Sequence, residues 1–222
     1  TFSMVTCGSS GRIPNGGRNF ESYGEDPFLT SRIAVSYVKG VQQEGVVATT
    51  KHFAVNNQET ERMTVNAVVD TRSLYEIYFP AFKAAVQEAK TEAIMCAYNK
   101  LNGPYCSENE VLLNNVLKEE WKFDGLVMSD WGAVHSTEGV AKYGLDLEMP
   151  GGEFLTKEKL LPLVTSGAVK PSVIDDKLRR IFRVMFRMGY FDAPLDKPEA
   201  NGPEQRAVAL DVARNGLVLL KN

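Results

Sequence analysis

The sequence is poor in the residues that build metal and disulfide sites, with two histidines and three cysteines among 222 residues. Two histidines do not make a histidine-rich metal site. An odd, sparse set of cysteines is not a disulfide framework, and we interpret Cys7, Cys96 and Cys106 as reduced thiols. No Asn-x-Ser/Thr sequon occurs, so nothing in the sequence indicates N-glycosylation.

Long apolar runs and an excess of one charge are also missing. No stretch approaches the roughly 18 apolar residues of a membrane span, so we expect no membrane partner. The net charge is −3, without the basic patch that nucleic-acid binding usually requires, so we expect no nucleic acid either. The composition is 44% hydrophobic and 24% charged, which is ordinary for a globular protein and excludes a disordered tail or a collagen-like repeat.

Short apolar runs alternate with amphipathic segments along most of the chain. This alternation is typical of a parallel sheet covered on both faces. A closed eight-stranded barrel typically needs about 250 residues. We therefore predict an α/β fold with parallel strands that has fewer units than a closed (β/α) barrel. The expected strands are 4–7, 46–53, 93–98, 125–130 and 145–149, and the expected helices are 27–45, 71–90, 107–121, 134–143, 153–165 and 171–188.

The start of one helix and the end of the domain carry more specific signals. Ser107, with Glu110 three residues on, is predicted to cap the helix over 107–121. After Gly189 the pattern changes to a segment rich in Pro, Asp and Asn, which indicates a linker over 191–204. The helical pattern from 205 and the apolar run 217–220, expected to be a strand, indicate the opening of a second domain.

Polar side chains follow the expected strands, at the edge where parallel α/β folds place their functional groups. Lys51 and His52 end one strand, Tyr98 ends the next, and Asp130 and Trp131 end the third. Together they predict a polar pocket with an aromatic wall, which suits a sugar. A carboxylate at Asp130 can attack an anomeric carbon or hold a metal, but it can also cap a helix or pair with a loop cation. Lys51 can equally well extend into solvent, and a lone His52 can be a hydrogen-bonded structural residue.

Two polar loops add candidates. The pair Gly16-Gly17 lets the backbone turn tightly and presents Arg18, and the loop lacks the Lys-Ser/Thr of a phosphate-binding P-loop. Segment 56–62 is too polar for the core, and is either a solvated loop or a rim that binds hydroxyl groups.

Six segments in this order and spacing resemble glycoside hydrolase family 3, the β-glucosidase and exo-glucosidase group, over roughly residues 11–190. They are GGRNFESYGEDP at 16–27, KHFAVNNQETER at 51–62, TRSLYEIYFPAF at 71–82, MCAYNKLNG at 95–103, FDGLVMSDW at 123–131 and DLEMPG at 146–151. The tail RNGLVLLKN resembles the start of that family's second, α/β sandwich domain. The resemblance implies a partial (β/α) TIM-barrel-like domain with parallel strands, truncated at both ends. It divides the chain into a partial barrel catalytic domain (1–190), a linker (191–204) and the start of the sandwich domain (205–222).

The resemblance also implies chemistry: hydrolysis of β-linked glucosides with retention, through a covalent glycosyl-enzyme and without a metal or organic cofactor. Asp130 of SDW would be the nucleophile. Arg18, Lys51, His52, Arg62 and Tyr98 would bind the terminal sugar, with Met95 and Trp131 as apolar walls. The implied partners are a β-linked glucoside or oligosaccharide and the remainder of the same protein.

A retaining enzyme needs a second carboxyl group about 5–5.5 Å from the nucleophile, to act as acid and then as base. Glu59, Glu61 and Glu148 are near in the chain, but none sits in a motif that the family uses for this purpose. The resemblance places that residue in the next domain, beyond Asn222. Two other functions stay open: a Schiff-base lyase with Lys51 as nucleophile, and a non-catalytic sugar-binding or scaffold remnant.

Overall fold

The computed structural model describes residues 2–6, 13–192 and 201–221, with side chains from residue 13 onward. The chain divides into two compact units, Thr1–Met188 and Gly189–Asn222. Cys7, most of the linker expected over 191–204 and the last residue of the expected strand 4–7 lie outside the described residues.

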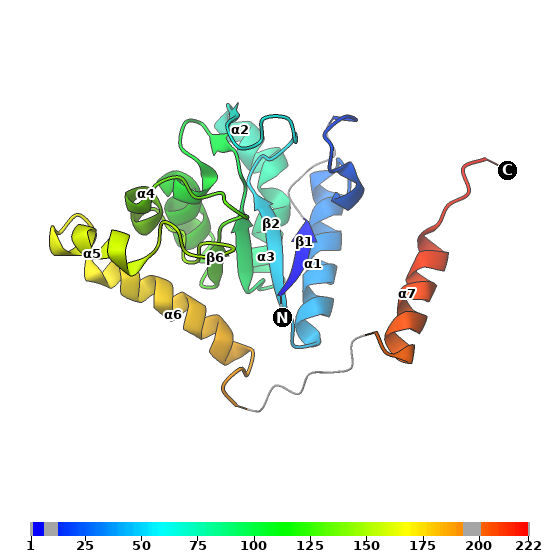
Figure 1. The fold of residues 1–222 in the computed structure, drawn as a ribbon. Helices are drawn as coiled ribbons and strands as arrows, with labels where there is room; N and C mark the ends of the chain where they lie inside the picture. Colours follow the sequence, from blue (N-terminus) through cyan, green and yellow to red (C-terminus); the bar gives the residue numbers. More distant parts are fainter. Residues whose placement is uncertain (1, 7–12, 193–200, 222) are drawn as a thin grey trace. The chain divides into compact units, whose positions relative to one another are not determined.

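Four parallel strands form the main sheet of the first unit, in the order β1-β2-β4-β6 (Figure 1), and β3 (Asn66–Ala67) pairs in parallel with β5 (Lys100–Leu101) in a small second sheet. The strands of the main sheet are β1 (Phe2–Thr6), β2 (Val47–Phe53), β4 (Ala93–Cys96) and β6 (Leu126–Met128). The register pairs Phe2 with Val47, Thr49 with Ala93, and Ala93 with Leu126. All their carboxyl ends therefore lie at one edge, and the predicted α/β fold with parallel strands is confirmed.

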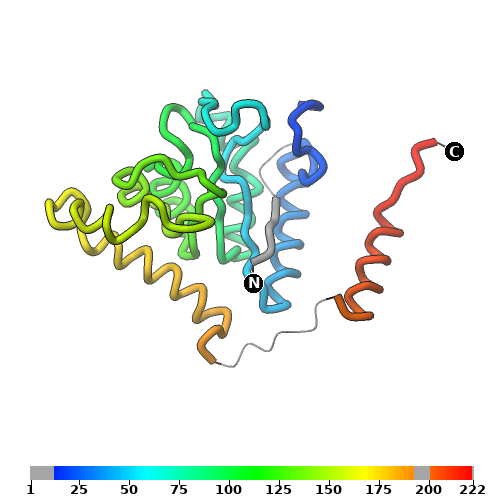
Figure 2. Tube along the Cα trace, viewed as in Figure 1, coloured from blue at the N-terminus to red at the C-terminus, as the bar shows by residue number. Residues whose placement is uncertain are grey.

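Helices follow the strands along the trace (Figure 2). Pro27 occupies the first turn of α1, where its missing N–H costs no hydrogen bond, and the Asp26 side chain caps that helix by accepting from the Leu29 N–H at 2.8 Å. The helices of this unit are α1 (Pro27–Gln43), α2 (Thr71–Ser73), η2 (Leu74–Tyr78), α3 (Pro80–Gln87), η4 (Val111–Glu120), α4 (Thr137–Lys142), α5 (Lys157–Thr165) and α6 (Pro171–Arg187), with 3-10 turns at Asn19–Glu21 and Cys106–Glu108.

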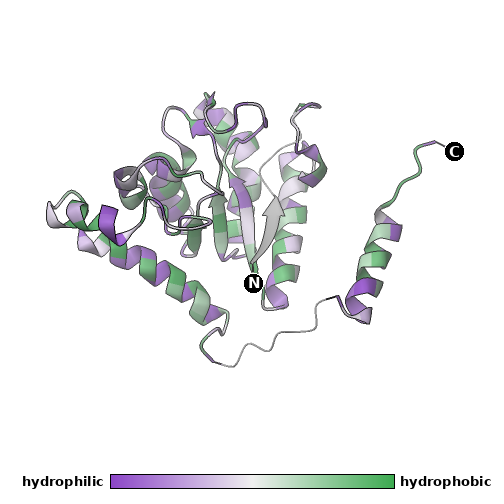
Figure 3. Cartoon of the chain, viewed as in Figure 1, coloured by the Kyte–Doolittle hydropathy of each residue, from purple (hydrophilic) through white to green (hydrophobic). Residues whose placement is uncertain are grey.

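Alternate strand residues enter two separate apolar clusters, as the period-2 geometry of a strand requires. The larger cluster contains Ile94 and Val127 with side chains of α1, α3 and η4, and at its centre Phe53 packs with Phe82 (ring centroids 4.9 Å apart) and Trp121 (5.7 Å). The smaller cluster contains Met95 and neighbouring strand residues with Val184 of α6. Figure 3 shows the mixed apolar and polar surface of α6 that fits this partly covered position.

Several predicted elements differ in detail. Asn109, not Ser107, caps η4: its Oδ1 accepts from the Leu112 N–H at 3.1 Å, while the Ser107 hydroxyl donates to the Ala133 carbonyl at 2.7 Å. The helix expected over 71–90 is interrupted before Pro80, which has no N–H to continue the ladder. The strand expected over 145–149 is reduced to one bridge between Met128 and Leu147.

The second unit contains helix α7 (Pro203–Gly216). The prediction of a strand over 217–220 was wrong: this segment forms no strand hydrogen bonds, and Leu220 is 93% exposed. A strand is stabilised by its hydrogen-bonded neighbours, and no described strand pairs with this one. Within the described ranges, no helix combines the length and apolar character needed to cross a bilayer.

Candidate active site

A pocket of about 260 Å³ opens at the carboxyl ends of β2, β4 and β6. All eight residues singled out from the sequence line it: Arg18, Lys51, His52, Arg62, Met95, Tyr98, Asp130 and Trp131. The strand-end residues reach it because parallel strands share this edge. Arg18 and Arg62 come from the loops before α1 and after β2, so the fold brings together side chains that lie 44 positions apart in the sequence.

Asp130 presents one free carboxylate oxygen at this pocket. Its side chain is almost buried, and Oδ1 accepts from the Trp131 N–H at 2.7 Å. Oδ2 lies 3.4 Å from Nε2 of His52 and makes no hydrogen bond of normal geometry to a described residue, although the Tyr98 hydroxyl approaches the same carboxylate. A buried acceptor without a partner is unusual in a folded protein. The local hydrogen bond to the backbone therefore accounts for Oδ1 but not for Oδ2.

Two neighbours of Asp130 are held in their neutral forms. Burial, and then the positive charges of Arg18, Lys51 and Arg62, lowers the pKa of His52 to about 2. Burial, and then the negative charge of Asp130, raises the pKa of Tyr98 to about 12. At neutral pH the imidazole is uncharged and the phenol keeps its proton, so both side chains act here through hydrogen bonding and shape.

The walls of the pocket combine apolar and cationic groups. The guanidinium of Arg62 lies over the Tyr98 ring, 4.4 Å from its centroid, within the range of a cation–π interaction. Met95 is buried beneath the pocket, whereas the Trp131 side chain is 47% exposed at the rim. This mixture of charged donors and aromatic faces is suited to a polyhydroxylated ligand.

The other carboxylates near in the chain are engaged elsewhere. Both oxygens of Glu148 accept backbone N–H groups of Phe154 and Leu155, at 2.8 to 3.1 Å. Glu59 pairs with Arg62, and the exposed Glu61 accepts from the Thr64 hydroxyl. Of the described residues, Asp130 alone contributes a carboxylate to the pocket lining. Nor do residues 13–192 and 201–221 contain a group of three or more His, Cys, Asp or Glu side chains that could hold a metal ion.

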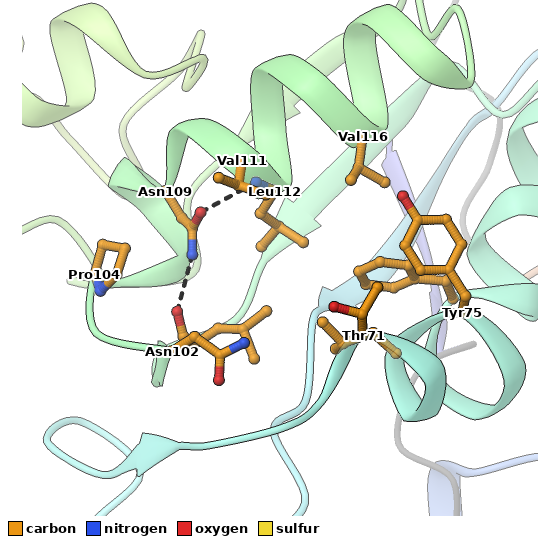
Figure 4. A pocket seen from close by; sticks show the side chains of 11 residues that line it. Thr71, Tyr75, Asn102, Pro104, Asn109, Val111, Leu112 and Val116 are labelled. Atoms are coloured by element: carbon orange, nitrogen blue, oxygen red, sulfur yellow. Dashed lines mark hydrogen bonds between the residues drawn. The ribbon is translucent and has the colours of Figure 1, made fainter.

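A larger and more apolar pocket, of about 330 Å³, lies between η2 and η4 (Figure 4). Two of its polar side chains already have partners within the chain: Asn109 donates to the Leu101 carbonyl at 3.0 Å, and the Tyr75 hydroxyl donates to Glu120 at 2.6 Å. The strand-end pocket is therefore the better candidate for chemistry.

One buried carboxylate, three cations and aromatic faces gathered at the carboxyl ends of parallel strands are what the active site of an α/β enzyme domain presents. Comparison with known families is specific. The profile of the glycosyl hydrolase family 3 N-terminal domain matches residues 9–184, and the chain belongs to this family. The resemblance stated from the sequence motifs is confirmed.

Curated relatives and solved structures agree with this assignment. The chain is 46% identical over 211 residues to thermostable beta-glucosidase B of Acetivibrio thermocellus, covering 95% of this chain and 28% of the relative. It is 50% identical over 208 residues to a beta-glucosidase of Rhizobium radiobacter, covering 93% and 25%. The structure of beta-glucosidase 3B from Thermotoga neapolitana in complex with glycerol matches with a TM-score of 0.91 at 41% identity, over 100% of this chain and 32% of that one.

A beta-glucosidase from Streptomyces venezuelae in complex with D-glucose gives a TM-score of 0.90, also at 41% identity, over 100% of this chain and 30% of that one. The chain thus spans between a quarter and a third of the length of these relatives. These relatives are glycoside hydrolases that act on O-glycosyl bonds.

Proposed function

We propose that the complete gene product carrying this sequence is a retaining β-glucosidase that removes terminal β-D-glucosyl residues. The observation that carries the proposal is Oδ2 of Asp130, a buried carboxylate oxygen without a hydrogen-bond donor at a pocket that opens on the strand ends. The beta-glucosidase names of the relatives, and the glucose bound to one of them, support a glucoside as the substrate.

In the first step Oδ2 attacks the anomeric carbon as the glycosidic bond breaks, and the leaving oxygen takes a proton from an acid. The product is a glucosyl ester of Asp130 and a free alcohol. In the second step water, activated by the conjugate base of that acid, attacks the same carbon and releases glucose and the carboxylate. Two displacements at one carbon retain the β configuration.

We assign sugar binding to the remaining pocket residues. Arg18, Lys51, Arg62 and neutral His52 donate to sugar hydroxyls, which accept charge-assisted hydrogen bonds well. Tyr98 lies beside the nucleophile, and Met95 and Trp131 provide apolar surface for the C–H face of the ring. Since Asp130 is the one carboxylate lining the pocket in the described chain, we place the acid/base outside these 222 residues.

Mechanism-based labelling tests the nucleophile. A 2-fluoro-glucoside with a good leaving group should add one fluoroglucosyl group to the complete gene product, and mass spectrometry of its peptides should place that group on Asp130. Asp130→Asn should take no label. A label on another carboxylate would contradict the assignment. Borohydride trapping with a carbonyl substrate tests the lyase alternative, which requires an adduct on Lys51.

The single carboxylate also favours a second candidate, that the 222-residue chain binds a sugar without cleaving it. Turnover of an aryl β-glucoside by this chain and by the complete gene product separates the two. Turnover by the complete product alone supports our placement of the acid/base. Equal turnover by both would show that the acid/base lies within these residues.

A further inference from the structure

Two glutamates that do not line the pocket lie between its cations. Glu21 Oε1 is 2.6 Å from Nε of Arg18, and Glu21 Oε2 is 3.7 Å from Nζ of Lys51. Glu59 Oε2 accepts from Nη1 of Arg62 at 2.5 Å, and Glu59 Oε1 is 3.9 Å from Nη1 of Arg18. The charges therefore alternate in one continuous row, from Lys51 through Glu21, Arg18 and Glu59 to Arg62.

This row joins three separate parts of the chain. Glu21 and Arg18 belong to the loop before α1, Lys51 to β2, and Glu59 and Arg62 to the loop after β2. The two loops approach closely where Glu59 reaches across, since a Cβ built on Gly17 would meet Glu59 Cγ at 2.8 Å. The glutamates thus hold cations that come from different loops in one arrangement.

The row also sets the charge of the site. Arg18, Lys51 and Arg62 supply three positive charges, and His52 adds none because its pKa is far below neutral. Against them stand Asp130 and the two glutamates, so positive and negative groups are equal in number. A pocket with this balance attracts a neutral sugar by hydrogen bonding, and has no excess positive charge to favour a carboxylate-bearing sugar.

We infer that Glu21 and Glu59 are positioning residues: they hold the pocket's cations in place and set its preference for neutral over anionic sugars. The inference rests on the function proposed above. Without the glutamates, three neighbouring cations repel one another, and the long side chains of arginine and lysine lose their fixed orientation. We expect the largest loss of orientation at Arg62, because Glu59 fixes the guanidinium that lies over the Tyr98 ring.

The test compares hydrolysis of an aryl β-glucoside and an aryl β-glucuronide by the complete gene product and its Glu21→Gln and Glu59→Gln variants. Glutamine keeps the shape and removes the charge. We expect KM for the glucoside to rise about tenfold with a smaller change in kcat, and the glucuronide-to-glucoside ratio of kcat/KM to rise about tenfold or more. Loss of packing alone would lower kcat/KM for both substrates by the same factor and leave that ratio unchanged.

Two further variants sharpen the test. Glu59→Asp keeps the charge but shortens the reach, so it should raise KM for the glucoside without changing the substrate ratio. Glu61→Gln is the matched control: Glu61 is two residues away, exposed and absent from the row, and its removal should change neither quantity. Circular dichroism and thermal unfolding verify that each variant is folded.

The outcomes separate this inference from the proposed function. Glucoside hydrolysis by the wild type, with an unchanged substrate ratio in both glutamine variants, overturns the inference and leaves the function standing. Absence of hydrolysis by the wild type overturns the function. The inference is then decided by calorimetric titration with glucose and glucuronate: a gain of glucuronate binding in the glutamine variants supports it, and no gain overturns it.

Discussion

Nε2 of His52 lies 3.4 Å from Oδ2 of Asp130, and both side chains are buried. Since the imidazole is neutral, it can donate toward the carboxylate without placing a further positive charge beside it. Nδ1 of His52 has no hydrogen-bond partner among the described residues either. The pair places the oxygen that we propose as the nucleophile beside a neutral imidazole, and both members can be tested separately.

Replacing Asp130 by alanine in the complete gene product should lower kcat on an aryl β-glucoside at least about a thousandfold, because a covalent step without its nucleophile is lost almost entirely. The free energy of unfolding should fall by no more than about 1–2 kcal/mol, since the contact of Oδ1 with the Trp131 N–H is lost while Oδ2 makes no hydrogen bond in the folded chain. Steady-state kinetics and thermal unfolding measure the two effects. Asp175→Ala, at an exposed position of α6, is the matched control. Turnover within tenfold of the wild type would remove Asp130 from the nucleophile role.

His52 should make stability depend on pH. Its pKa falls from 6.5 to about 2 on folding, so between these values the unfolded chain binds a proton that the folded chain does not. The free energy of unfolding therefore decreases as the pH falls below 6.5, by up to about 1.4 kcal/mol per pH unit from this group. Above pH 6.5 the group is neutral in both states and contributes no slope.

Urea unfolding at several pH values between 4 and 8, followed by tryptophan fluorescence, measures this dependence in the wild type and in His52→Gln. Other titrating groups affect both proteins alike, so the difference between their unfolding free energies isolates His52. We expect the wild type to lose stability relative to the variant as the pH falls from 6.5 to 4. A difference that stays constant with pH would mean that His52 ionises normally.

The rule that functional groups lie at the carboxyl ends of parallel strands predicts much of the site from the sequence alone. Each of the three apolar runs contains a strand of the parallel sheet. Lys51 lies near the end of β2, and Tyr98 and Asp130 follow β4 and β6, so these polar side chains meet at one edge of the sheet. Arg18 and Arg62 were different. They lie on loops without periodicity. The sequence itself indicated only a tight turn that presents Arg18 and a polar segment that contains Arg62, and the motif resemblance gave both a role, because loop paths depend on contacts distant in sequence.

The ion pairs of Glu21 were missed altogether. A glutamate three residues after an arginine is common on any surface, and nothing local says that Lys51 will lie on its other side. The helix cap at Asn109 was missed for a related reason. Ser107 and Glu110 have capping-box spacing, but the Ser107 hydroxyl is taken by the Ala133 carbonyl, a tertiary partner 26 residues away. Local rules fail where a distant group competes for the same side chain.

The buried pair Lys118–Asp146 should be costly to break from one side. Lys118 Nζ donates to Asp146 Oδ1 at 2.8 Å, and Asp146 Oδ2 also accepts from the Val127 N–H at 2.9 Å. Lys118→Met leaves the buried carboxylate without its cation and should lower the free energy of unfolding by about 3 kcal/mol. The measurement is urea unfolding at pH 7.

Adding Asp146→Asn to that variant should recover at least half of the loss, because the amide oxygen can still accept from the Val127 N–H and the unpaired carboxylate is gone. Lys157→Met, at an exposed position of α5, should change stability by no more than about 0.5 kcal/mol. If the single and the double variants are equally destabilised, packing of the Lys118 stem rather than the charge pair carries the effect.

A side chain at position 17 should destabilise the fold, because the φ of +92° is strained for any residue other than glycine and an added Cβ would meet Glu59 Cγ at 2.8 Å. Gly17→Ala should therefore destabilise the fold by about 1–2 kcal/mol and raise KM for the glucoside, since Glu59 must shift and Arg62 with it. Gly40→Ala is the matched control: Gly40 lies inside α1 with no atom within 4 Å of an added Cβ, and alanine there should be neutral or stabilising. A variant with lower stability but unchanged KM would show that the backbone strain is real and that the loop contact does not influence the arginines to which we assign sugar binding.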